Sequence, residues 1–170
     1  MISDFNNQNN KAKEAEVIAR RIILQQDEFC GIYDTSDVKK YQEQDIDFIA
    51  YKIWTGEAVS FEIKNDDRIN ETNNIFAEID RIYSDHTSDG WLKCSKAQWF
   101  FYRDSIKQVS YLFELDNLKE FIKNNKTKVV TVPDYNKGRK IKDVKGHLVN
   151  INKFANQYPV WVYNDNGEML

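Results

Sequence analysis

Cysteine, histidine, glycine and proline are all scarce in this chain. Its 170 residues include two cysteines, two histidines, six glycines and two prolines. Cys30 and Cys94 form neither a zinc-site spacing nor a disulfide framework, which favours a reducing compartment. His86 and His147 have no neighbour at metal-ligand spacing, so we assign them no chemistry. So few glycines and prolines leave little room for flexible linkers.

Long apolar runs are also absent. No stretch approaches the roughly 18 residues that a membrane-spanning helix needs, and the N-terminus lacks a signal-peptide pattern. We therefore expect a cytoplasmic protein with no membrane partner. Hydrophobic residues make up 41%, charged residues 30% and aromatic residues 14% of the chain, which is a globular composition. Length and composition together predict a single domain, residues 1–170, with a substantial core.

The charges are unevenly distributed along the sequence. The formal net charge is -3, yet residues 119–153 contain ten Lys and Arg against three acidic residues. That segment has a local balance of +7, which leaves -10 for the remainder. One interpretation is an acidic metal-binding cleft beside a basic phosphate-binding surface. The alternative is that the basic segment is only a solvated face.

One segment combines a strand pattern with charges that strands normally avoid. Apolar and polar residues alternate from Val59 to Lys64, so the period of two places Glu62 and Lys64 on the same face. The simplest explanation for two opposite charges in this position is an exposed ion pair, which contributes little to stability.

A second strand is expected upstream, over residues 41–51, and it contains Asp47. Thr55-Gly56-Glu57 reads as the hairpin turn between the two strands. Antiparallel pairing would bring Asp47 beside Glu62, where two carboxylates are costly unless positive charge lies between them. A metal ion supplies that charge.

This order of residues resembles the PD-(D/E)XK nucleases, which include restriction enzymes and Holliday-junction resolvases. The resemblance rests on Asp47 followed by Glu62-Ile63-Lys64, although Ile46 stands where the family name has proline. It covers residues 11–124 and implies an α/β (α+β) fold with a restriction-endonuclease-like core, a central mixed sheet flanked by helices. Residues 125–170 would form a basic, β-rich C-terminal extension.

The resemblance also implies Mg²⁺-dependent hydrolysis of DNA phosphodiester bonds. Asp47 and Glu62 would hold the metal together with the backbone carbonyl of Ile63. Lys64 would orient the attacking water or stabilise developing negative charge. Oxygen ligands without His or Cys favour Mg²⁺, and Mn²⁺ is expected to substitute.

A Glu from the first helix often joins the metal site in the resolvase-like branch. Helical spacing of apolar residues predicts that helix over residues 11–26, after a frayed start. Glu16 is the candidate ligand by resemblance, and the alternative is that Glu14 and Glu16 are both surface residues.

A helix is expected over residues 71–83, because Ile75, Phe76, Ile79 and Ile82 recur at helical spacing. At its N-terminus, Thr72 and Asn74 could donate hydrogen bonds to a phosphate, although capping alone explains Thr72 equally well.

The remaining pattern predicts further strands and two short helices. Strands are expected at residues 29–33, 97–102, 109–115, 129–132 (closed by Pro133), 148–151 and 160–163. Helices are expected at residues 116–124 and 153–158.

Lys96 and the basic segment supply the other expected DNA contacts, with Lys137, Arg139 and Lys140 as candidates. Because no recognition helix is apparent, DNA would be held chiefly through its phosphates, and binding should weaken steeply with salt. A homodimer is expected, since two sites related by a two-fold axis most simply cut both strands. Two other classes stay open: a catalytically silent nucleic-acid-binding protein, and a phage-encoded inhibitor that mimics nucleic acid.

Overall fold

The computed structural model describes the backbone of residues 3–136 and 139–170, and the side chains of residues 10–135 and 139–170. The helices are α1 (Ser3–Leu24), α2 (Lys39–Gln42), α3 (Ile69–Thr72), α4 (Trp91–Cys94), α5 (Leu115–Asn124) and α6 (Ile151–Ala155). The strands are β1 (Phe29–Asp34), β2 (Phe48–Lys52), β3 (Ala58–Asn65), β4 (Asn74–Ile82), β5 (Thr87–Asp89), β6 (Trp99–Asp104), β7 (Val109–Glu114), β8 (Lys128–Asn136), β9 (Arg139–Asn150) and β10 (Trp161–Asn164). No described helix has the length and apolarity to cross a membrane.

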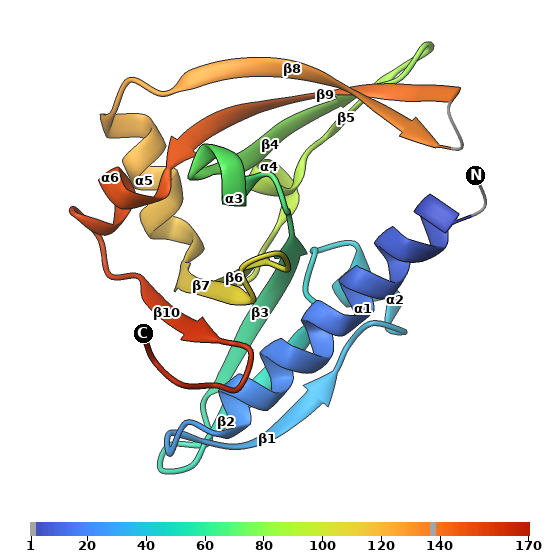
Figure 1. Cartoon of the computed structure of the whole chain (residues 1–170). Helices are drawn as coiled ribbons and strands as arrows, with labels where there is room; N and C mark the ends of the chain where they lie inside the picture. The colour runs from blue at the N-terminus through green and yellow to red at the C-terminus, as the bar shows by residue number, and fades with distance from the viewer. Residues whose placement is uncertain (1–2, 137–138) are drawn as a thin grey trace.

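The described strands form two sheets, which corrects the expectation of one central sheet (Figure 1). The first has the order β1-β2-β3-β6-β7-β10 and is antiparallel except where β3 runs parallel to β6. The second is antiparallel, with the order β5-β4-β9-β8. The result is a mixed α+β fold, in which a curled mixed sheet has helices on its flanks.

The chain passes repeatedly between the two sheets. Within the described residues it crosses four times, through α3, α4, α5 and α6. Strands β8 and β9 therefore pair with β4 from the middle of the sequence, and β10 pairs with β7. The segment after residue 125 is interwoven with both sheets and is not set apart from them.

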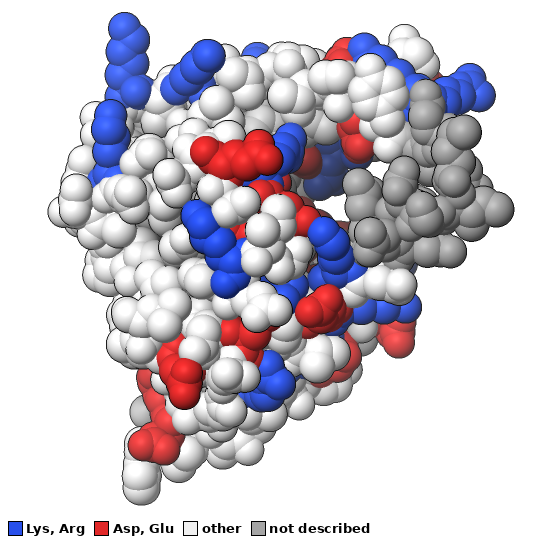
Figure 2. All heavy atoms as spheres, in the orientation of Figure 1, with Lys and Arg blue, Asp and Glu red and all other residues white. Residues whose placement is uncertain are grey.

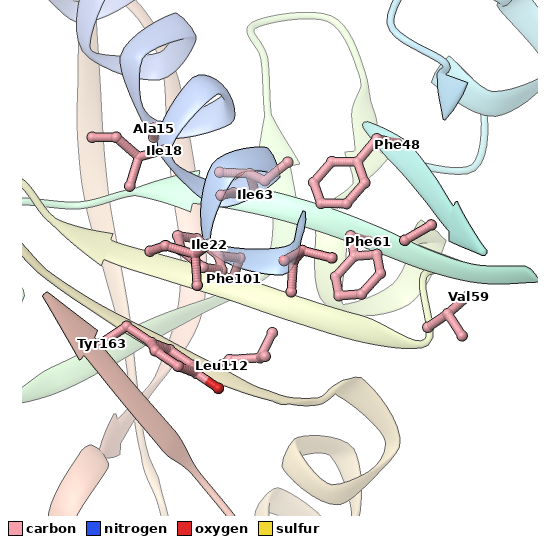
Figure 3. Packing of buried hydrophobic residues seen from close by; sticks show 13 residues of the cluster. Ala15, Ile18, Ile22, Phe48, Val59, Phe61, Ile63, Phe101, Leu112 and Tyr163 are labelled. Carbon is pink, nitrogen blue, oxygen red and sulfur yellow. The ribbon is translucent and has the colours of Figure 1, made fainter. Parts of the chain in front are cut away.

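Helix α1 packs on one face of the first sheet (Figure 3). Ala15, Ile18 and Ile22 of the helix are buried against the apolar set of β3, which consists of Val59, Phe61 and Ile63. The alternation read from the sequence is therefore confirmed for this face. Fully burying a side chain of this size stabilises the fold by about 1.5–3 kcal/mol, so the helix is fixed firmly beside β3.

The other face of the first sheet packs against the second sheet and helices α5 and α6. Phe100 and Tyr102 of β6 enter this second core, whereas Phe101 between them enters the first. Because β6 is buried on both faces, its sequence is a continuous aromatic run. Ile75 of β4 and Val149 of β9 contribute to the same core, which holds the two sheets together.

The helix expected over residues 71–83 is wrong. Helix α3 ends at Thr72, Asn73 adopts the left-handed conformation with φ 51°, and Asn74 begins β4. Left-handed Asn is a common way to end a helix. Strand β4 pairs along its length with β9, and this pairing between distant segments outweighs the local helical spacing.

Several other boundaries differ from those expected. Helix α1 begins at Ser3, inside the start expected to fray, and residues 41–47 are not strand, since β2 begins at Phe48. Pro133 does not close its strand, because β8 is an edge strand and an edge tolerates a residue without an N–H. The expected strands corresponding to β1, β3, β6, β7 and β10 are confirmed, as is the turn between β2 and β3.

Candidate functional site

The hairpin of β2 and β3 brings Asp47 beside Glu62. The last paired residues of β2 and β3 are Phe48 and Phe61. Asp47 lies just before β2, and its N–H still donates to the Phe61 carbonyl at 2.9 Å. One further step of that register places Asp47 opposite Glu62 on the same face. The Asp47 carboxylate Oδ2 accepts a hydrogen bond from the Ile63 N–H at 2.7 Å, so the side chain is held across the free edge of β3.

Glu62 is buried, with only 1% of its surface exposed. Its Oε1 accepts a hydrogen bond from Lys64 Nζ, whereas its Oε2 has no hydrogen-bond donor among the described residues. The Glu62 carboxyl group can still share a proton with the neighbouring Asp47 carboxylate. The Lys64 side chain is 33% exposed. An exposed ion pair therefore does not describe Glu62. A buried carboxylate oxygen without a hydrogen-bond donor is costly, and it suits either a bound proton or a bound cation.

Burial raises the pKa of Glu62 to about 8, with Lys64 opposing the shift and Asp47 adding to it. Burial likewise raises the pKa of Asp47, although Lys64 and the Ile63 N–H favour its anion. Burial lowers the pKa of Lys64, but the neighbouring carboxylates outweigh this and the net direction is upward. Glu62 can raise the pKa of Lys64 only while Glu62 is ionised, whereas the raised pKa of Glu62 favours its neutral form. Burial of Glu62 is the stronger constraint, because Lys64 still reaches solvent, and Glu62 holds a proton near neutral pH.

Stability is expected to fall as pH rises from 4.5 to about 8. Across that window Glu62 stays protonated in the folded protein and ionises in the unfolded chain, so the folded state binds more protons. The slope from this one group is about -1.4 kcal/mol per pH unit. Denaturant unfolding across the window should show a shallower decline for Glu62→Gln than for wild type. Equal slopes in the two proteins would contradict the raised pKa.

Asp47, Ile63 and Lys64 line a cavity of about 960 Å³ between the two sheets. Its other walls come from α1, the segment after β3, β4, β6, α4, β8 and β9. Figure 2 shows charged side chains of both signs gathered around the hollow on this face of the molecule. Glu62 is buried next to the cavity but does not itself line it.

The lining of the cavity contains five basic and six acidic side chains. Each basic side chain has an acidic partner: Lys11 with Asp67, Lys64 with Glu62, Arg68 with Asp66, Arg81 with Glu78, and Lys142 with Asp134. Because acidic side chains outnumber basic ones in the lining, the cavity is not a positive funnel by itself. A divalent cation beside Asp47 would reverse its formal charge and make it receptive to phosphate.

Of the two helix carboxylates, Glu16 lies at the site. It lines the cavity, and its pKa is raised by burial and by the nearby charge of Asp47. Arg20 also pairs with it at 3.1 Å. Glu14 is directed elsewhere, to the buried Arg103 at 3.1 Å.

Of the residues expected to contact DNA, those that the structure describes do not line the cavity. Thr72 lies at the end of α3, where its hydroxyl donates to the Arg68 carbonyl, and Asn74 begins a strand. Neither stands at a helix N-terminus, so the phosphate contact argued from that position is corrected.

The basic candidates are placed on the outer surface. Lys96, Arg139 and Lys140 are exposed, and Lys140 pairs with Asp143 at 2.7 Å. Lys137 lies outside the described residues.

Sequence reasoning missed Arg68, Arg81, Lys142 and Lys11, the other basic residues of the cavity. Arg68 had a usable signal, because it follows Asp66 and Asp67 directly after the Glu62 strand. Arg81 and Lys142 had none, since each reaches the cavity only through the pairing of β4 with β9.

The residues present fit a Mg²⁺ ion. In the described parts of the chain, no three His, Cys, Asp or Glu side chains are grouped as a complete metal site. Mg²⁺ usually takes one or two carboxylates and fills its other positions with water and substrate phosphate, which suits Asp47 and the unpartnered Glu62 Oε2. Strand alternation also turns the Ile63 carbonyl to the same edge as the Phe61 carbonyl, beyond the end of β2.

We compared the chain with protein-family models, with curated proteins and with solved structures, and none of them matches it.

Proposed function

We propose that this protein is a metal-dependent endonuclease that hydrolyses DNA phosphodiester bonds, built on a restriction-endonuclease-like core of the PD-(D/E)XK type. One observation carries the proposal: Asp47 and Glu62 stand opposite each other, with a buried Glu62 oxygen that has no partner among the described residues and with Lys64 alongside. Asp47 directly precedes β2 and Glu62 lies on β3, and these are adjacent strands of a helix-covered mixed sheet, which also supports the proposal.

Asp47, Glu62 and the Ile63 carbonyl would hold the metal, with Glu16 as a further carboxylate of the cavity. Bound Mg²⁺ would neutralise charge on the scissile phosphate and lower the pKa of the attacking water. Hydrolysis then joins the water oxygen to phosphorus and breaks the bond to the leaving sugar oxygen, which takes up a proton. Lys64 Nζ, partly exposed at the cavity, donates a hydrogen bond to the attacking water or to the phosphate oxygen that gains charge.

The protonated Glu62 makes metal binding dependent on pH. A carboxyl group must lose its proton to become a ligand, so binding should release a proton and strengthen as pH rises towards about 8. Isothermal titration with Mg²⁺ or Mn²⁺, repeated in buffers of different ionisation enthalpy, measures both stoichiometry and proton release.

Glu62→Gln is the matched control for this titration, because it keeps the side-chain volume and has no proton to release. We expect it to abolish proton release and to weaken metal binding strongly. If neither cation binds the wild type, or if Glu62→Gln binds them equally well, the metal site is not here.

Cleavage itself is tested with supercoiled plasmid and linear DNA in Mg²⁺, in Mn²⁺ and in chelator. A silent nucleic-acid-binding protein would bind DNA without metal-dependent nicking. A nucleic-acid mimic would bind metal without defined stoichiometry. A homodimer stays part of the proposal, and light scattering with and without DNA tests it.

A further inference from the structure

The cavity at Lys64 is enclosed on several sides by the fold. The first sheet and α1 form one side, and β4, β8 and β9 of the second sheet form the other. A volume of about 960 Å³ matches the upper range of pockets for single small ligands, which is roughly 300–1,000 Å³. Such a space holds a few nucleotides of one strand, whereas the major groove of duplex DNA alone is about 12 Å wide.

Of the candidate catalytic groups, Lys64 lies on the wall of this space, and Glu62 is buried directly behind it. Glu62 is 1% exposed and Lys64 is 33% exposed. The phosphates of a duplex lie on the outside of a stiff rod and cannot enter a recess between two sheets. A strand that has left its complement can bend inwards, as it does in enzymes that act on single strands or extruded nucleotides.

Arg68 is fixed on the wall of the same cavity by a buried anchor. The hydroxyl of Tyr102, a residue that is 2% exposed, donates to Asp66 Oδ2 at 2.7 Å. Asp66 in turn accepts two hydrogen bonds from the Arg68 side chain, from Nε at 2.9 Å and from Nη2 at 3.1 Å. The guanidinium group also lies over the Phe76 ring, 5.3 Å from its centre.

This arrangement leaves part of the guanidinium group available. Nη1 of Arg68 has no hydrogen-bond partner among the described residues, and the side chain is 60% exposed. A planar guanidinium group held in one orientation is well suited to bind phosphate. The other cations of the cavity are lysines, whose ammonium groups are point charges, and Arg81. Arg81 is bound to Glu78, and its side chain is less exposed than that of Arg68.

We propose that the cavity binds a single strand of DNA, detached from its complement, and that Arg68 holds one phosphate of that strand while Lys64 faces the scissile one. The proposal rests on the proposed endonuclease function and names its substrate class. Single strands and the unpaired ends or flaps of duplexes are the substrates that it admits.

The first test compares three labelled DNAs of the same sequence: a single strand, a blunt duplex, and a duplex with an unpaired extension. Fluorescence anisotropy with Glu62→Gln in chelator measures binding without cleavage. The single strand and the extension should bind about tenfold or more tightly than the blunt duplex. Wild type in Mg²⁺ should then cut within unpaired DNA.

Equal affinity for the blunt duplex, or equally rapid cutting inside it, would overturn the substrate class and leave the endonuclease function standing. Selective binding of single strands without cleavage by wild type in Mg²⁺ or Mn²⁺ would overturn the endonuclease function and support the cavity as a single-strand site. The two failures are therefore distinguishable.

The second test uses Arg68→Gln and Arg68→Lys. Loss of one phosphate contact should reduce the salt slope of single-strand binding by about 0.7, and Arg68→Lys should restore the slope with weaker affinity. Lys39→Gln is the charge-matched control, because Lys39 is 88% exposed and does not line the cavity. Thermal unfolding confirms that the variants are folded. An Arg68→Gln slope equal to that of Lys39→Gln would overturn the role of Arg68.

Discussion

Glu62→Gln is expected to abolish DNA cleavage without destabilising the protein near neutral pH. The change removes the anionic form of a buried residue that would hold the metal, so cleavage should fall by at least about 10³-fold. Stability should be equal or higher, because the wild-type carboxyl group keeps a proton there that it loses on unfolding, its pKa being raised to about 8 by burial. A neutral amide of nearly the same shape takes its place.

Single-turnover cleavage and denaturant unfolding measure the two effects separately. Glu120→Gln on α5 is the control, since Glu120 is exposed and far from the hairpin of β2 and β3 in sequence. Asp47→Asn should behave like Glu62→Gln, because the amide oxygen can still accept from the Ile63 N–H. A Glu62→Gln protein that cuts DNA at the wild-type rate in Mg²⁺ would falsify the assignment.

Lys64→Met is expected to reduce turnover by about 10²–10³-fold while metal binding persists. The substitution keeps the aliphatic stem and removes the ammonium group that would act on water or phosphate. Glu62 Oε1 also loses its hydrogen-bond donor, so the pKa of Glu62 should rise further and metal binding should move to higher pH. Because Glu62 can keep its proton, the loss of stability should be modest.

Titration calorimetry and single-turnover rates, both followed against pH, check this prediction. Lys39→Met is the control, on an exposed side chain outside the cavity. If Lys64→Met loses metal binding at every pH together with turnover, Lys64 serves the structure of the site and not the reaction. Unchanged turnover would remove Lys64 from the mechanism altogether.

The hairpin that carries the candidate site could be predicted because its signals are local. Alternation from Val59 to Lys64 fixes the two faces of β3, and the turn at Gly56 sets which residue of β2 lies near Glu62. The depth of Glu62 could not be predicted. The face of β3 that carries Glu62 is covered by the second sheet. The first strand of that sheet begins nine residues after β3, and its last strand ends at Asn150.

The same non-local pairing explains the wrong helix over residues 71–83. Ile75, Phe76, Ile79 and Ile82 satisfy a helical period, and the β-branched Ile75, Ile79 and Ile82 with the aromatic Phe76 were the local sign of a strand. Pairing with β9 makes this segment a strand, and it joins Ile75 to Val149, more than seventy residues away. One wall of the cavity is assembled by this pairing, which is why Arg81 and Lys142 could not be recognised from the sequence.

The four crossings between the sheets have a consequence for how the protein folds and moves. Each sheet is built from segments that alternate along the chain with segments of the other, so neither sheet can be expressed or unfolded as an independent piece. The contact order is correspondingly high, and folding should be slow for a chain of this length. Four covalent connections also prevent the sheets from separating about a single hinge. A DNA strand bound as proposed would therefore thread into a space of nearly fixed width.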